Sequence, residues 1–147
     1  MEKGTKKNET EVSHGQFLSI FENSINAILF GIPDGTLLDA NPAAVEMFGY
    51  SIEELRKLGR GAIFDTTDPK MIAALKTRTE TGKAKGEIIG IRKNGERFPC
   101  EFSSAIFKTE TGESRTSTVL NDISERKKAE EEITLLMDNT EESFVLV

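Results

Sequence analysis

The 147-residue sequence has one cysteine, one histidine, no tryptophan and no long uncharged apolar run. A lone cysteine, Cys100, leaves no partner for an internal disulfide and no thiolate cluster for a metal. The apolar runs are far too short to span a bilayer, and no signal peptide is recognisable. We therefore expect a cytoplasmic location for this fragment, although a longer protein that contains it could be attached to a membrane.

Strong positive charge is also absent. The formal net charge is −6, and the basic residues are scattered rather than gathered in a stripe. This argues against a nucleic-acid partner and against direct contact with an anionic membrane. A hydrophobic content of 37% and a charged content of 30% suit one globular domain with solvated helices.

Recognisable catalytic patterns are missing as well. The sequence has no glycine-rich phosphate loop, no Ser/His/Asp set and no metal-ligand spacing. The paired acids Glu53 and Glu54 follow Ser51 as a capping box, so they indicate a helix start rather than a catalytic pair. We expect no enzymatic activity from this fragment by itself.

Residues 85–123 are the most informative stretch, because they predict three strands joined by two tight turns. Asn94-Gly95 predicts a hairpin with a type I′ turn, and residues 109–113 predict a second turn. Between the turns, Phe98, Cys100 and Phe102 alternate with polar residues, which predicts one apolar face. Such a three-stranded unit cannot cover that face alone.

The preceding half supplies the cover. It predicts a helix over residues 17–25 and strands over 27–32 and 36–40. Cap signals then start short helices at Asn41-Pro42, Ser51 and Asp68-Pro69. The predicted fold class is α+β: a five-stranded antiparallel sheet with short helices on one face, plus flanking N- and C-terminal helices.

The domain organisation that we expect has four parts. They are a flexible leader (1–16), the domain (17–123), an exit helix (124–140) and the start of a second, similar domain (141–147). The last part rests on an internal repeat, because residues 20–30 resemble residues 136–146 at a constant offset of 116. The alternative is that residues 144–147 form the last strand of this same domain.

Five short stretches, in a fixed order, resemble those of PAS sensory domains. They are Asp34-Gly35-Thr36; Asn41-Pro42-Ala43-Ala44; Phe48-Gly49-Tyr50-Ser51-Ile52-Glu53-Glu54-Leu55; Arg92-Lys93-Asn94-Gly95-Glu96-Arg97-Phe98-Pro99; and Asp122-Ile123-Ser124-Glu125-Arg126. The resemblance covers residues 17–126. The family's fold agrees with the α+β prediction.

The resemblance implies a sensory or regulatory module of a signalling protein, which we expect to be a sensor histidine kinase in a two-component system. A cavity would bind a small ligand or relay packing changes to an output domain. Its expected lining is Met47, Phe48, Phe64, Met71, Leu75, Ile88 and Phe102. The expected signalling residues are Asp122, Ile123 and Ser124, with Arg92 and Lys93 as the two candidate partners of Asp122. The alternative is a ligand-free module for protein–protein interaction and dimerisation.

No cofactor is evident from the sequence. Haem members of the family use a histidine on the helix before the three-stranded unit, and here the helix over residues 68–80 has none. The only histidine, His14, lies in the leader. Cys100 lies on a strand rather than on the helix where cysteinyl-flavin members carry theirs, so we expect an inert core thiol. Haem and a flavin adduct are both disfavoured, and the ligand is unknown.

The expected partners are a second copy of the chain and the neighbouring PAS and output domains of a longer protein. Ala129, Ile133, Leu136 and Thr140 are spaced 4, 3 and 4 apart, which is typical of a short coiled-coil seam. This seam and the helix over residues 17–25 predict a weak parallel homodimer.

Overall fold

The computed structural model describes the backbone of residues 2–146 and the side chains of residues 13–138. In chain order the elements are α1 (Glu2–Asn23), β1 (Ala27–Gly31), β2 (Leu37–Ala40), α2 (Pro42–Phe48), α3 (Ile52–Leu58), the 3-10 turn η1 (Arg60–Ala62), α4 (Pro69–Thr81), β3 (Lys83–Ile91), β4 (Arg97–Lys108), β5 (Ser114–Asp122) and α5 (Ser124–Leu146).

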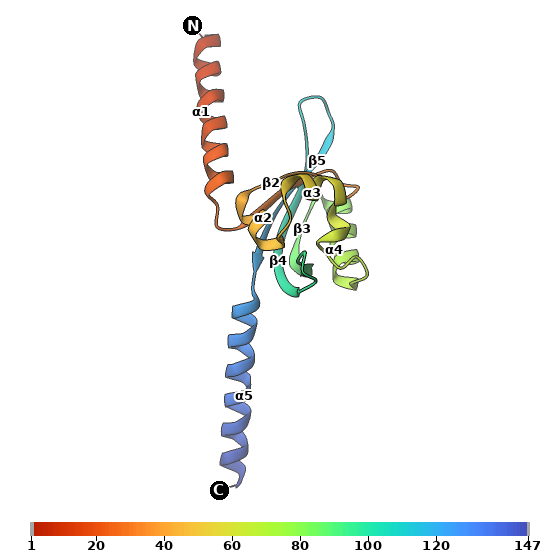
Figure 1. Ribbon diagram of the computed structural model, residues 1–147. Helices are drawn as coiled ribbons and strands as arrows, with labels where there is room; N and C mark the ends of the chain where they lie inside the picture. Colours follow the sequence, from red (N-terminus) through yellow and green to blue (C-terminus); the bar gives the residue numbers. More distant parts are fainter. Residues whose placement is uncertain (1, 147) are drawn as a thin grey trace.

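The five strands form one antiparallel sheet in the order β2-β1-β5-β4-β3. Figure 1 shows α2, α3 and α4 on one side of this sheet, so the predicted α+β fold is confirmed. The first and last strands of the sequence pair in its centre, with Ala27 opposite Leu120. Because this pair is antiparallel, α1 enters and α5 leaves at the same end of the sheet.

Aromatic side chains fill much of the space between the helices and the sheet. The ring of Phe48 lies 5.8 Å, centroid to centroid, from the rings of Phe64 and Phe98. On β4 the predicted alternation holds, since Phe98, Cys100 and Phe102 are all buried. Burial of each large apolar side chain stabilises the fold by about 1.5–3 kcal/mol.

Asn41 connects three elements from within the core. Its Oδ1 accepts hydrogen bonds from the amides of Ile28 (2.8 Å) and Ala44 (3.0 Å), and its Nδ2 donates to the carbonyls of Phe21 and Asn26. The predicted helix cap is therefore also a link from α2 to β1 and to the end of α1. A buried amide whose donors and acceptor are all satisfied adds specificity without an uncompensated desolvation cost.

Helix α1 is longer than the sequence predicts. It extends upstream to Glu2, through most of the segment 1–16 that the sequence analysis assigns to a flexible leader. The flexibility of that leader stays a prediction. No proline interrupts residues 2–23, and each residue added to an existing helix gains one backbone bond. The C-terminal end of α1 is fixed to the sheet by aromatic contacts, because the ring of Phe21 stacks on Phe30 of β1 and the ring of Phe17 lies tilted against it.

Helix α5 continues to Leu146, beyond the predicted end at residue 140. Residues 144–146 are therefore helical here rather than extended. A strand needs a neighbouring strand to satisfy its backbone, and the described residues provide none beside this segment. A second domain starting at residue 141 stays a prediction.

Figure 1 shows α1 and α5 extending from the domain in opposite directions. Neither of them, nor any other helix described, is both long and apolar enough for a membrane span.

Three hairpin connections share one geometry. In the turn before β4, the amide of Gly95 donates to the Arg92 carbonyl and the amide of Arg92 donates to the Glu96 carbonyl, both at 2.9 Å. Only glycine has a positive φ in this turn, so Asn94 does not adopt the left-handed conformation of a type I′ turn. The predicted type is wrong: this is a type I turn followed by a left-handed glycine that forms a bulge. The connections that contain Gly35 and Gly112 have the same pattern.

Gly95→Val should lower the free energy of unfolding by roughly 1–2 kcal/mol, because a β-branched residue is strained at a φ of +89°. A Cβ at this position would meet no atom within 4 Å, so the loss reports backbone strain alone. Denaturant unfolding measures it. Gly95→Asn is the matched control, since asparagine tolerates the left-handed region, and it should recover most of the loss. Equal stability of the valine variant and the unmodified chain would contradict the turn geometry.

Candidate functional site

A small interior cavity lies between α4 and the strands β3, β4 and β5. Its volume is about 40 Å³, enough for one to a few water-sized groups. The structure brings five of the seven predicted lining residues to it: Phe64, Met71, Leu75, Ile88 and Phe102. These side chains form its apolar wall.

The other two predicted lining residues lie elsewhere. Phe48 is fully buried and packs against Phe64 and Phe98, outside this cavity. Met47 is partly buried against the core, and its carbonyl accepts a hydrogen bond from Arg92. Both residues lie at the end of α2, whereas the helix that lines the cavity is α4. The apolar pattern of a helix shows which residues face the core, but it does not show which of the core residues border a cavity.

The cavity also has a polar side that the sequence analysis missed. It consists of Arg60, Arg78, Ser104 and Thr118. Arg78 is only 7% exposed, whereas the apolar side chain of Ile72 on the same helix is 57% exposed. The signal was available in the spacing, because Arg78 follows Met71 by seven residues and so falls on the same helix face.

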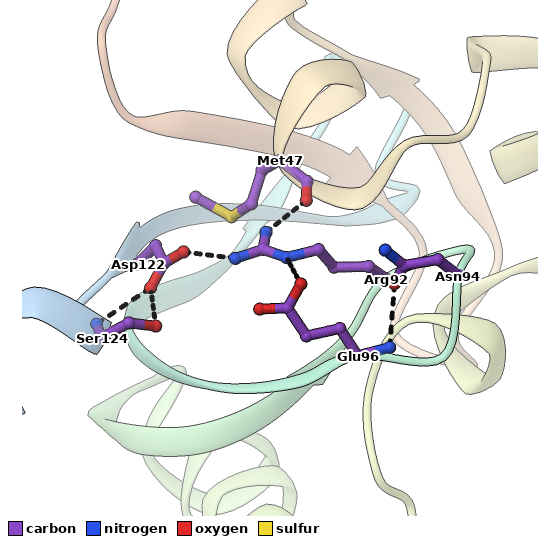
Figure 2. A network of polar contacts seen from close by, with 6 residues as sticks. All are labelled: Met47, Arg92, Asn94, Glu96, Asp122 and Ser124. Carbon is purple, nitrogen blue, oxygen red and sulfur yellow. Dashed lines mark hydrogen bonds and ion pairs between the residues drawn. The ribbon is translucent and has the colours of Figure 1, made fainter.

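A second constellation joins the sheet to the start of α5 (Figure 2). The guanidinium of Arg92 donates from Nη2 to Asp122 Oδ2 at 2.6 Å and from Nη1 to the Met47 carbonyl at 2.6 Å. Its Nε lies 3.3 Å from Glu96 Oε2. The guanidinium carbon also lies 3.9 Å from the ring centroid of Phe98. One side chain thus contacts α2, β4, β5 and the hairpin turn.

Asp122 continues this network into α5. Its Oδ1 accepts hydrogen bonds from the Ser124 amide (2.9 Å) and the Ser124 hydroxyl (2.5 Å), the first residue of the helix. Burial raises the pKa of Asp122, but the bonds from Ser124 and Arg92 outweigh burial and bring the pKa below its usual value. The carboxylate is therefore ionised at neutral pH. Ile123, which lies between Asp122 and Ser124 in the chain, is buried and so fixes the start of α5 against the domain.

Lys93, the other candidate partner of Asp122, points to a different acid. Its Nζ lies 2.8 Å from Glu54 Oε2, at the start of α3. The first turn of α5 has further ties to the outer face of the sheet. Arg126 lies 3.0 Å from Glu101, and Lys127 lies 3.0 Å from Glu87. These pairs are exposed, so each contributes roughly 0–1 kcal/mol.

The described residues favour no metal or covalent cofactor. Among them no cluster of three or more His, Cys, Asp or Glu side chains has the geometry of a metal site. His14 is exposed on α1. Cys100 is fully buried on β4, and burial, with the negative charge of Asp122, raises the pKa of its thiol to about 12.

The sheet with helices on one face, the small interior cavity and the hydrogen-bonded start of α5 place the chain among small single-sheet α+β domains. Comparison with known proteins identifies the family: the PAS domain model matches residues 25–125. The chain belongs to the PAS domain family. It is 27% identical over 121 residues to sporulation kinase E of Bacillus subtilis (strain 168). That match covers 82% of this chain but only 16% of the kinase.

Solved structures give the same fold. The PAS domain of a protein from Colwellia psychrerythraea superposes with a TM-score of 0.67 at 21% identity, over 76% of this chain and 97% of that one. A domain of a sensory box sensor histidine kinase/response regulator from Geobacter sulfurreducens gives a TM-score of 0.62 at 22% identity, over 75% and 94%. These similarities establish the architecture of the domain.

The Cys100 thiol should be unreactive in the folded protein, because it is inaccessible and its thiolate is scarce near pH 8. Labelling with an aromatic disulfide reagent at pH 8 should be at least about 100-fold slower than in denaturant. The control is Ser103→Cys in a Cys100→Ala background, which places a thiol at an exposed position three residues further along β4 and should label quickly. Rapid labelling of native Cys100 would contradict its burial.

Proposed function

We propose that this PAS domain is the sensory module of a longer signalling protein, a sensor histidine kinase, and relays the state of its cavity to an output domain through α5. The similarity to part of a sporulation kinase supports the kinase assignment, as does the structural neighbour from a sensor histidine kinase/response regulator. The output activity itself belongs to regions outside this chain.

One observation carries the proposal: β5 takes part in both constellations. Thr118 lines the cavity, and Asp122, four residues further along the same strand, binds Arg92 and the start of α5. At about 3.3 Å per residue the two positions are roughly 13 Å apart on a stiff, paired element. A shift of β5 caused by a change in the cavity therefore moves the carboxylate that holds the first turn of α5.

A second candidate function is a ligand-free dimerisation module. Apolar side chains on both flanking helices favour it, since Ile20 of α1 and Ile133 and Met137 of α5 are each more than half exposed. The two helices extend from the domain in opposite directions (Figure 1). A two-fold axis that runs parallel to both helices would place α1 beside α1 and α5 beside α5 of a second copy of the chain. The two candidates are compatible, because a dimeric exit helix can also carry a signal.

Asp122→Ala should uncouple α5 from the sheet at a small cost in stability, roughly 1–2 kcal/mol, because Arg92 keeps its other acceptors. Amide exchange at Ser124 should rise, and output of the longer protein should stop responding to its stimulus.

The stability that Asp122 contributes should depend on pH, because its pKa is lower in the folded protein than in the unfolded chain. The contribution is fully present above the unfolded pKa near 3.9 and is lost as the pH falls through the folded pKa. The stability difference from the variant should therefore vanish in acid.

Glu96→Ala is the matched control for this experiment. It removes the other carboxylate that Arg92 contacts but leaves the start of α5 untouched. Exchange at Ser124 and the response to stimulus should stay normal. If Asp122→Ala also leaves both unchanged, the transmission route that we propose is wrong.

Dimerisation is tested by sedimentation of the 147-residue chain beside a truncation to residues 17–126. We expect weak association of the full chain and none of the truncation. Ile133→Asp should weaken association at least tenfold, because it places a charge in the apolar seam, whereas Thr134→Asp on the next face should not. Equal association of the truncation would place the interface elsewhere.

A further inference from the structure

Arg78 is a buried cation without a matching anion. Its side chain is 93% shielded from solvent, and Nη1 donates to the Ser104 hydroxyl at 3.0 Å. Its Nε finds no hydrogen-bond partner among the described residues, and none of their carboxylates forms an ion pair with it. Arginine does not escape this situation by losing a proton, so the uncompensated charge is strongly unfavourable in the isolated fold.

Arg60 adds a second positive charge to the same cavity. It is half-buried, and Nη1 reaches only the Pro33 carbonyl, at 3.4 Å, a length typical of a weak bond. Burial lowers the pKa of Arg78, and the charge of Arg60 lowers it further. The negative charge of Asp34 acts on Arg60, but the Asp34 carboxylate also accepts a hydrogen bond from the amide of Thr36 in its own turn. An anion in the cavity would stabilise both guanidinium groups.

The remaining walls define the rest of the ligand. Ser104 and Thr118, whose hydroxyls lie 2.8 Å apart, can bind an oxygen beside Arg78. The opposite wall is apolar and includes Met71, Leu75 and Phe102. A cavity of about 40 Å³ accepts only a few heavy atoms. A charged, planar head with a short hydrocarbon tail meets all three conditions, whereas an inorganic anion would leave the apolar wall without a contact.

We propose that this cavity binds a short-chain aliphatic carboxylate of two or three carbons, with the carboxylate on Arg78, Ser104 and Arg60 and the tail against the apolar wall. The planar fork of a guanidinium suits the two oxygens of a carboxylate. This assignment rests on the proposed sensory function, because it names the class of ligand that the module would detect.

The test is calorimetric and thermal titration of the 147-residue chain with sodium acetate and sodium propionate at constant ionic strength. We expect saturable binding and a rise in Tm with each carboxylate. Propionamide has nearly the same shape as propionate but no charge. Neither propionamide nor sodium chloride should show saturable binding or raise the Tm. Saturation by propionamide at the same concentrations, or no saturable effect of any carboxylate, would overturn the proposal.

Arg78→Met should raise the dissociation constant for propionate at least about 30-fold, because the charge-assisted bonds are lost. Without ligand its Tm should equal or exceed that of the unmodified chain, since an unpaired buried charge is removed. Lys76→Met, on the exposed side of the same helix, is the matched control and should bind normally. Arg78→Lys, which keeps the charge but not the fork, should bind with intermediate affinity.

A large fall in Tm for Arg78→Met would assign Arg78 a structural role and overturn the proposal, as would equal affinity in the Lys76 and Arg78 variants. The outcome is separable from that of the Asp122 experiment. If carboxylates do not bind while Asp122→Ala still uncouples α5, only the ligand assignment fails. If they bind through Arg78 while Asp122→Ala changes nothing, the ligand assignment is supported and the relay fails.

Discussion

A partly buried guanidinium needs hydrogen-bond acceptors on several sides, and the acceptors of Arg92 come from separate parts of the chain. It binds Asp122 at the end of β5 and the Met47 carbonyl at the end of α2, and it covers the ring of Phe98. The last carbonyls of a helix have no partner within the helix, so a cation there satisfies both groups. Helix layer, sheet and exit helix are thereby held at one point. A lysine could not make these contacts at once, since it has no planar fork.

The two shielded arginines of the domain differ in an informative way. Arg92 has its acceptors, and the result is a well-determined junction. Arg78 has one hydroxyl and an unsatisfied Nε, although it is the more deeply buried of the two. Folds usually satisfy buried charge, and departures from that rule concentrate where function requires them. The contrast separates Arg92, whose donors are bound by several parts of the fold, from Arg78, whose Nε has no partner among the described residues, and β5 joins the two regions.

Much of the fold could be read from short-range patterns. The starts of α2, α3 and α4 follow from Asn41, Ser51 and Asp68, each of which accepts a bond from an amide two or three residues later. The turn at Gly95 was placed correctly but assigned the wrong type, because the type depends on which backbone groups pair across the hairpin. Arg78 was missed because a charged residue on a helix is normally solvated.

The sequence by itself determined the number and position of the strands, the starts of α2, α3 and α4 and the glycines of the turns, because these depend on groups within about four residues of one another. Only the tertiary structure decided that β1 lies beside β5, that Arg78 faces inward, and that Arg92 rather than Lys93 binds Asp122. Arg92 and Asp122 are 30 residues apart in the chain. Arg92 and Lys93 both lie in the turn after β3, so the choice between them is made by what the packed helices and sheet place beside each side chain and not by local preference.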